Sequence, residues 1–442
     1  MIEERDHYVL VPDPSRSAVL VASTVAGPVI PLVRGPRGAA GVIESLHHWY
    51  GLDAAYLRTA RLLRDEERNP TGGLHELDSA PPEWRPPSGT MWLGLEHADA
   101  PALAPAALHD DIERWIAEQL GAPVPDSRPS WSRPGWLPHV SLWIRETATA
   151  CGLRPTGGVE VVEHWPLSSV LRIETDGGKV FFKAVFPIFR HEPVVTAQLS
   201  ARHPTLTPEL LAIDEHRGWM LMRELRGAPI GDQDVSRWGE GLRAAASIHK
   251  AWIGRDAELL SLGAHDRTLQ ALERDMAAGF DEVDLSSEDR LRLEASLPTF
   301  ARASAELGAG AVPETLVHGD LHPWNVMARD EGVRVFDWSD SCVSYPLFDL
   351  PTYLERTDDE QARAVLLDAY LEAWSDAAPM GELRALAECA HPLALMHHSI
   401  SYSRILEAME PADRWWFDGE PARRLRLAVE RAEELGRAWN AI

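Results

Sequence analysis

The pattern of apolar and polar positions divides the first part of the chain into predicted strands and helices. Short apolar runs predict strands, and two longer stretches predict helices. The strands are expected at 8–11, 18–22, 29–33 and 91–95, and the helices at 39–50 and 109–120. This order of elements predicts an α/β domain at the start of the chain.

A segment rich in proline and serine, residues 123–138, follows this domain. Such residues interrupt both helices and strands, so we expect a linker there. At 442 residues the chain is also too long for one ordinary core. The predicted division is an α/β domain at 1–125 and a linker at 126–138, with the rest of the chain after it.

Two apolar runs after the linker predict a β-hairpin. Residues 170–173 and 180–186 flank the turn Asp176-Gly177-Gly178, which suits a tight connection. A helix is expected at 192–200, and further helices are expected within 353–440.

Two motifs near residue 320 carry the chemistry of a phosphotransferase. The segment HGDLHPWN spans 318–325, and VFDW spans 335–338, after a short apolar run. Phosphoryl transfer needs positioning, charge neutralisation by Mg²⁺ and an acceptor for the hydroxyl proton. Asp320 stands where a kinase catalytic loop has its base. Asn325 and Asp337 supply the hard oxygen ligands that Mg²⁺ prefers.

A third segment, Pro346-Leu347-Phe348-Asp349-Leu350, follows in the same order. Together the three motifs resemble those of the aminoglycoside phosphotransferase and choline kinase-like superfamily, over about residues 135–442. The resemblance implies an α+β, protein-kinase-like bilobal fold. Its β-rich N-lobe and hinge would lie at 139–225, and its mainly helical C-lobe, with the catalytic loop and acceptor pocket, at 226–442. It also implies that His318 and Asp349 support the catalytic loop and take no part in the chemistry.

Lysine is rare in this chain, which makes a phosphate-binding cation easy to look for. Only three of the 43 lysine and arginine residues are lysines, and Lys183 lies within the predicted strand 180–186. In protein kinases a strand lysine contacts the phosphates and pairs with a helix glutamate. The nearest candidate glutamate is Glu192, and Glu209 is its rival.

The remaining nucleotide contacts are expected from backbone-rich segments. The phosphate loop Gly-x-x-x-x-Gly-Lys-Ser/Thr does not occur in the sequence. In place of a kinase glycine-rich loop, Ser168 and Ser169 and their amides would cover the phosphates. Residues 219–225 resemble the hinge of the superfamily, which implies that the backbone around Met222 and Glu224 binds the adenine of ATP. The sequence leaves GTP open as an alternative.

The sequence says less about the residues that bind the molecule that accepts the phosphate. His322 in the loop, and His398 and Tyr402 in the expected C-terminal helices, are the candidate acceptor contacts. His249 recurs at helical spacing with apolar residues and is expected to pack within a helix.

The first domain resembles a Nudix domain at residues 44–52, where the signature helix would end. Nudix hydrolysis requires glutamates that hold Mg²⁺, but Ser45, His48 and Trp49 stand at those positions. Neutral and aromatic side chains cannot replace hard anionic ligands. We therefore expect a Nudix-like fold without hydrolysis, which would serve recognition, dimerisation or support.

The composition of the chain argues against some classes of binding partner. The net charge of −25 argues against nucleic acid and anionic membranes, which both need basic surfaces. Cys151, Cys342 and Cys389 form no metal or redox motif, and no apolar run reaches 18 residues. A cytoplasmic setting is expected.

Three functions remain open at this point. The first is an ATP- and Mg²⁺-dependent kinase of a small-molecule hydroxyl, either on an antibiotic or on a biosynthetic metabolite. The second is a nucleotide-binding regulatory protein without activity, against which the presence of Lys183, Asp320, Asn325 and Asp337 weighs. The third is a Nudix-like hydrolase, which the missing glutamates disfavour.

Overall fold

The computed structural model describes residues 5–36, 38–65 and 69–441. The chain folds into two compact units. The first contains Met1–Phe186 and Met409–Trp416, and the second contains Pro187–Ala408 and Phe417–Ile442. Within the described residues, no helix is long and apolar enough to cross a membrane.

The first unit combines two sheets with an antiparallel meander. Its helices are α1 (Gly38–Tyr50), α2 (Ala100–Leu103), α3 (His109–Gln119) and α4 (Trp136–Ala150). Its strands are β1 (Arg5–Leu10), β2 (Ala18–Thr24), β3 (Gly27–Val29), β4 (Leu32–Gly35), β5 (Tyr56–Arg64), β6 (Pro70–Leu77), β7 (Thr90–Gly94), β8 (Pro155–Trp165), β9 (Ser168–Thr175) and β10 (Gly178–Val185). The larger N-terminal sheet has the order β4-β1-β6-β5, with only β1 and β6 parallel. The smaller sheet, β3-β2-β7, is antiparallel, as are the pairs of the β8-β9-β10 meander.

The larger sheet is apolar on both faces, because successive strand residues point to opposite sides. Val9 of β1 packs in one cluster with Val42 and Leu46 of α1. Its neighbour Leu10 packs in a second cluster with Trp115 of α3. Each helix therefore covers one face of the sheet.

A buried ion network, which we call the arginine cluster, also lies in the first unit. Arg58 and Arg128 have side chains no more than 5% exposed, and four buried carboxylates surround them. The segment Met409–Trp416 supplies two of these carboxylates. The ion pairs are Arg58–Glu76 at 2.9 Å, Arg58–Glu410 at 3.2 Å, Arg58–Asp413 at 3.1 Å, Arg128–Glu410 at 2.6 Å and Arg128–Glu118 at 2.6 Å.

The second unit is mainly helical. Its helices are α5 (Glu192–Arg202), α6 (Trp238–Ala251), α7 (Asp256–Ser261), α8 (Leu269–Ala278), α9 (Ser287–Ala309), α10 (Leu350–Leu354), α11 (Glu360–Leu371), α12 (Met380–Ala408) and α13 (Glu420–Asn440). Its strands are β11 (Leu210–Asp214), β12 (Trp219–Arg223), β13 (Ala228–Pro229), β14 (His265–Asp266), β15 (Thr315–Val317), β16 (Val326–Arg329), β17 (Gly332–Val335) and β18 (Cys342–Ser344). Strands β11 and β12 form a hairpin, and two small sheets have the orders β13-β16-β17 and β14-β18-β15.

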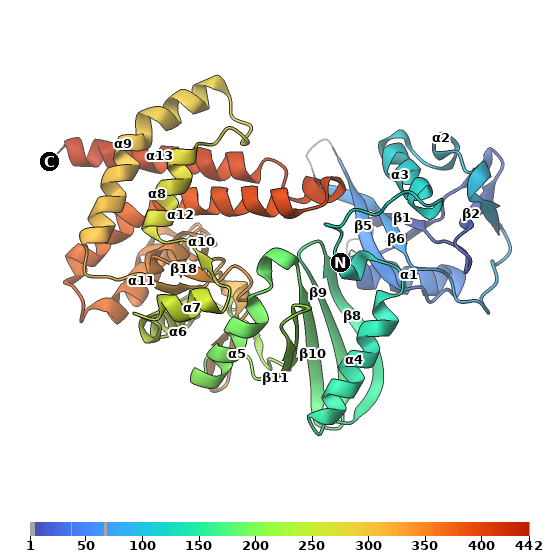
Figure 1. Ribbon diagram of the computed structural model, residues 1–442, viewed down its shortest axis with the longest axis horizontal. Coiled ribbons are helices and arrows are strands. Elements are labelled where there is room, and N and C mark those ends of the chain that lie inside the picture. The colour runs from blue at the N-terminus through green and yellow to red at the C-terminus, as the bar shows by residue number, and fades with distance from the viewer. Residues whose placement is uncertain (1–4, 37, 66–68, 442) are drawn as a thin grey trace. The chain divides into compact units, whose positions relative to one another are not determined.

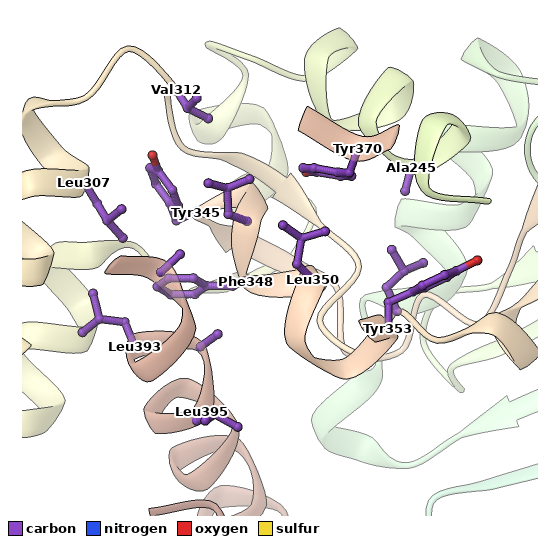
Figure 2. Packing of buried hydrophobic residues seen from close by; sticks show 14 of the residues in the cluster. Ala245, Leu307, Val312, Tyr345, Phe348, Leu350, Tyr353, Tyr370, Leu393 and Leu395 are labelled. Atoms are coloured by element: carbon purple, nitrogen blue, oxygen red, sulfur yellow. The ribbon is translucent and has the colours of Figure 1, made fainter. Parts of the chain in front are cut away.

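One apolar core runs through the second unit. Helices α12 and α13 lie side by side (Figure 1). In Figure 2, Phe348 lies close to Leu393 of α12, whereas Leu350 lies farther from that helix; Tyr345 and Tyr370 of α11 belong to the same buried cluster. The segment that carries Asp349 is thus fixed on both sides of that residue by large buried side chains.

The predicted α+β class is confirmed, as is the hairpin of β9 and β10 around its turn. Strands β5 and β6 were not predicted. Strand β5 is rich in leucine and arginine, which favour helices, so its partners decide its conformation. Residues 126–138, the predicted linker, contain the buried Trp131 and the start of α4 and lie inside the first unit.

Candidate active site

The predicted catalytic loop lies in the second unit, between a buried strand and a hairpin. Strand β15 is fully buried and ends directly before His318. Strands β16 and β17 then pair with Val326 opposite Val335. The amide of Phe336 donates to the carbonyl of Asn325 over 3.0 Å, which extends this pairing. Asn325 and the residue after Phe336, Asp337, therefore come to the same end of one hairpin.

Asp349 fastens the start of the loop. Its Oδ2 accepts a hydrogen bond from the amide of His318, and its Oδ1 accepts one from the amide of Gly319, both over 2.8 Å. Nε2 of His249 lies 3.2 Å from Oδ2. Burial by itself raises the pKa of Asp349, but His249 and the His318 amide hold that pKa below its ordinary value.

Gly319 is required by the close approach of two backbone segments. Its φ is +83°, and a Cβ at this position would lie 2.2 Å from the carbonyl oxygen of Asp340. A side chain would therefore push the loop away from the segment that follows Asp337.

His318 connects the loop to that same segment. The ring is fully buried, and its Nε2 donates to the carbonyl of Phe336 over 2.9 Å. Its ring centroid lies 4.7 Å from that of Trp338. Asp337, between these two partners, has a φ of +65°, a conformation that is uncommon for a non-glycine residue and is concentrated at functional sites.

The oxygen atoms of Asn325 and Asp337 suit a magnesium ion. Nδ2 of Asn325 donates to the carbonyl of Asp320 over 3.1 Å, which orients the amide so that its oxygen is directed elsewhere. Oδ1 of Asp337 accepts a hydrogen bond from Ser339. In the described part of the chain, no group of three or more histidine, cysteine and acidic side chains could hold a metal. Two protein oxygens suit Mg²⁺, which keeps waters and phosphate oxygens as its other ligands.

Asp320, the predicted base, is open to solvent, with a side chain that is 48% exposed. Nε2 of His322 lies 3.8 Å from its Oδ2. Burial lowers the pKa of His322, and the charge of Asp320 opposes this only in part. The structure therefore brings the candidate acceptor contact His322 next to the predicted base.

The charge of Asp320 influences the pKa of two residues of α12, His398 and Tyr402. Burial lowers the pKa of His398 to about 4, although the charges of Asp320 and Asp349 act in the opposite direction. Burial, together with the charge of Asp320, raises the pKa of Tyr402 to about 12. Asp320 is thus among the charges that influence the pKa of both predicted acceptor contacts.

The predicted nucleotide contacts divide between the units. Lys183 is a buried residue of β10 in the first unit, whereas Glu192 begins α5 in the second and is only 1% exposed. The rival Glu209 is exposed and pairs with Arg223 over 2.8 Å, which favours Glu192 for a buried role. The phosphate and helix contacts of Lys183 stay predictions.

Ser168 and Ser169, expected to cover the phosphates, begin β9. Ser169 is fully buried and its hydroxyl lies 3.1 Å from Nδ1 of His164, so this hydroxyl is committed inside the protein. Ser168 accepts a hydrogen bond from the indole of Trp165 over 2.7 Å. This arrangement argues against the Ser169 hydroxyl as a phosphate contact. Met222 is the last but one residue of β12 and Glu224 directly follows the strand, both half-buried, and their adenine contact stays a prediction.

Sequence reasoning did not assign a supporting role to His249 or to Arg424. His249 packs within α6, as expected, and also contacts Asp349. Nη1 of Arg424 lies 3.5 Å from Glu355, and the charge of Arg424 lowers the pKa of His398. No local pattern distinguishes such residues from other helix residues, because their partners lie far away in the sequence.

Comparisons with known proteins complete the description of this region. Residues 169–388 match the model of the phosphotransferase enzyme family. A search of curated proteins finds no match. Among solved structures, the chain is similar to a choline/ethanolamine kinase family protein from Mesorhizobium loti, with 20% identity, 62% of this chain and 92% of that chain covered, and a TM-score of 0.44.

Two further solved structures are similar at the same level. A macrolide 2′-phosphotransferase from Brachybacterium faecium has 18% identity, with 64% of this chain and 98% of that chain covered and a TM-score of 0.44. The choline kinase of Streptococcus pneumoniae has 14% identity, with 67% and 99% covered and a TM-score of 0.46.

Proposed function

The chain belongs to the phosphotransferase enzyme family through residues 169–388, and from this premise we propose that it transfers the γ-phosphate of ATP to a hydroxyl group of a small molecule. The observation that carries the proposal is the convergence of three oxygen-bearing side chains on one loop and hairpin. Asp320 is open to solvent, while Asn325 and Asp337 sit at the same hairpin end.

In this proposal Asp320 accepts the proton of the acceptor hydroxyl as its oxygen bonds to the γ-phosphorus and ADP leaves. Asn325 and Asp337 would hold Mg²⁺, which supplies charge neutralisation for the phosphates when bound. The amide of Asn325 is already oriented for this by its hydrogen bond to the backbone of Asp320.

His318 and Asp349 position the loop and do not touch the reacting atoms. The Asp349 carboxylate receives the first two amides of the loop, and His318 links the loop to the carbonyl before Asp337. On the acceptor side, His322, His398 and Tyr402 are the proposed contacts. Burial lowers the pKa of both histidines, so these contacts are neutral near pH 7. An acceptor bound there would meet neutral hydrogen-bonding groups beside one carboxylate.

The proposal is tested by incubating the purified chain with labelled ATP, Mg²⁺ and a panel of hydroxylated compounds that includes aminoglycosides, macrolides, choline and sugars. A phosphorylated product from any acceptor, lost in Asp320→Ala and retained in Asp330→Ala, is the expected result. Asp330 is an exposed aspartate in the turn between β16 and β17. ATP binding without any product across the panel would instead favour the regulatory alternative.

A further inference from the structure

The first unit contains a cavity of 450 Å³ that the phosphotransferase site does not use. Ligand pockets in proteins commonly have volumes of about 300–1,000 Å³. Strands β1, β5, β6 and β8, the start of α1 and the segment Met409–Trp416 all contribute to its wall. The residues that decide its chemistry are His7, Tyr56, Thr59, His75, Trp165 and Trp416.

A chain of hydrogen bonds with a fixed direction runs along this wall. Nε2 of His7 lies 3.0 Å from the carbonyl oxygen of Pro36 and 3.3 Å from that of Gly35, so it must carry the proton and donate. Nδ1 of His7 is therefore an acceptor. It lies 3.0 Å from Nε2 of His75, which must donate to it.

The same logic fixes the other end of the chain. With its proton on Nε2, neutral His75 accepts at Nδ1, which lies 3.1 Å from the hydroxyl of Tyr56 and 3.3 Å from that of Thr59. These two hydroxyls also hydrogen-bond to each other. One of the two hydroxyls, Tyr56 or Thr59, therefore donates its proton to Nδ1 of His75, and the other donates its proton to the first hydroxyl.

No hydroxyl proton remains for a molecule in the cavity. Tyr56 is 2% exposed, whereas Thr59 is half-buried and is the hydroxyl that a ligand can reach. In either proton arrangement, Oγ1 of Thr59 keeps a free lone pair. The cavity wall thus offers an acceptor at Thr59, and only a ligand that donates a hydrogen bond satisfies it.

The rest of the cavity wall is aromatic and aliphatic, and its imidazoles are uncharged. Burial lowers the pKa of His75 to about 3 and that of His164, which also lines the cavity, to about 4. The rings of Trp165 and Trp416 meet edge to face, with centroids 6.5 Å apart, and Tyr56 and His164 meet in the same way at 6.0 Å. The two charged lining residues, Arg5 and Glu163, already interact with other groups of the protein.

We propose that this cavity binds an uncharged aromatic molecule that donates an O–H or N–H hydrogen bond to the hydroxyl of Thr59. Flat apolar rings match the indole and phenol surfaces, whereas a charged ligand would lose its hydration without gaining a free ion-pair partner. The proposal is independent of the phosphotransferase activity, because none of the proposed phosphotransferase contacts lines this cavity.

Two matched probes test the proposal on the full chain by isothermal titration calorimetry. The probes are 2-naphthol, which has the donor, and 2-methoxynaphthalene, which has the same ring system without it. We expect 2-naphthol to bind roughly tenfold more tightly, the value of one good hydrogen bond. Equal affinities for the two probes, or no saturable binding of either, would overturn the proposal without any variant being made.

Variants then locate the bound probe. In Thr59→Val the preference for 2-naphthol should fall to less than about twofold, because the acceptor is gone while the shape remains. Thr149→Val is the matched control: Thr149 is exposed on α4 of the same unit and its hydroxyl bonds to its own helix, so the preference should persist. Leu62→Trp fills the cavity and should abolish binding of both probes. Full binding in a folded Leu62→Trp protein would contradict the assigned location.

Discussion

Both units bury carboxylates, but they stabilise them with different groups. Asp349, beneath the catalytic loop, receives two backbone amides and faces His249. In the arginine cluster, four carboxylates share two guanidinium groups. Burial opposes the charged form in both places, yet the pKa of Asp349 ends below its ordinary value while that of Asp413 rises to about 6.

The difference shows that the supply of donors decides whether a buried carboxylate stays charged. Each oxygen of Asp349 accepts a hydrogen bond from a separate backbone amide, and these two bonds stabilise the negative charge. In the arginine cluster negative groups outnumber positive ones. Within the described residues Asp413 forms an ion pair with Arg58 alone, while Glu410 and Glu76 repel it. The first arrangement suits a loop that must be held in one geometry. The second suits the joining of distant segments.

Removal of a carboxylate that is not buried should separate activity from stability. We expect Asp320→Ala to lower the rate of phosphoryl transfer by about 10²–10⁴-fold, because the acceptor hydroxyl loses its general base. The side chain is 48% exposed, so thermal unfolding should change little. Steady-state kinetics and calorimetric melting of the same preparation measure both effects. Undiminished transfer would refute the role of Asp320.

Removal of one guanidinium group should lower the stability of the first unit, because carboxylates already outnumber guanidinium groups in the arginine cluster. Arg58→Met leaves Glu76 and Asp413 buried without Arg58, so the free energy of unfolding of the first unit should fall by about 3–5 kcal/mol. Urea titration followed by circular dichroism measures this loss. Arg172→Met is the control, since Arg172 pairs with Glu160 at an exposed position of the same unit and should cost at most about 1 kcal/mol.

Asp349→Asn tests whether two amide donors require a full carboxylate. The asparagine NH₂ group must face one of the two loop amides, so we expect a loss of about 1–3 kcal/mol and faster hydrogen exchange at His318 and Gly319. Asp359 also accepts two backbone amides, at the exposed start of α11, where asparagine caps a helix equally well. Unchanged exchange in Asp349→Asn, or an equal loss in Asp359→Asn, would contradict the comparison.

The last prediction is a pH dependence of stability that arises from Asp413. Its pKa is about 6 in the folded chain and 3.8 in its ordinary state, so the unfolded chain releases this proton first as the pH rises. Stability contributed by Asp413 is therefore complete below pH 3.8 and is lost as the pH rises through about 6, at a cost of about 3 kcal/mol. Asp413→Asn should remove this part of the pH profile. Identical profiles of unfolding free energy between pH 4 and 7 would disprove it.

How much could be foreseen from the sequence depended on how far apart the interacting residues lie. The loop from His318 to Asn325 and the metal-ligand candidate Asp337 occupy one short stretch, so their spacing alone indicated the site. His249 could not be assigned in this way, because its partner Asp349 is 100 positions away and helical spacing explains it equally well.

The first unit was harder to foresee for the same reason. The cavity network joins β1, β5 and β6, and two of these strands were not predicted at all. Gly72 of β6 illustrates the cause: a Cβ there would lie 2.1 Å from the carbonyl of Asp6, so this glycine serves close strand pairing. In the sequence, the same residue indicates only a turn or a break.

The assignment of Met409–Trp416 to the first unit has a consequence for the order of events during synthesis. When residues up to Phe186 have left the ribosome, Arg58 and Arg128 lack Glu410, and the cavity lacks Trp416. This unit can reach its final form only after most of the second has been made, contrary to the usual domain-by-domain sequence from the N-terminus. In a chain stopped before residue 409, Arg58 and Arg128 would lack the carboxylates of Glu410 and Asp413. The first unit would then be less stable, and quality-control proteases would degrade such a chain more readily.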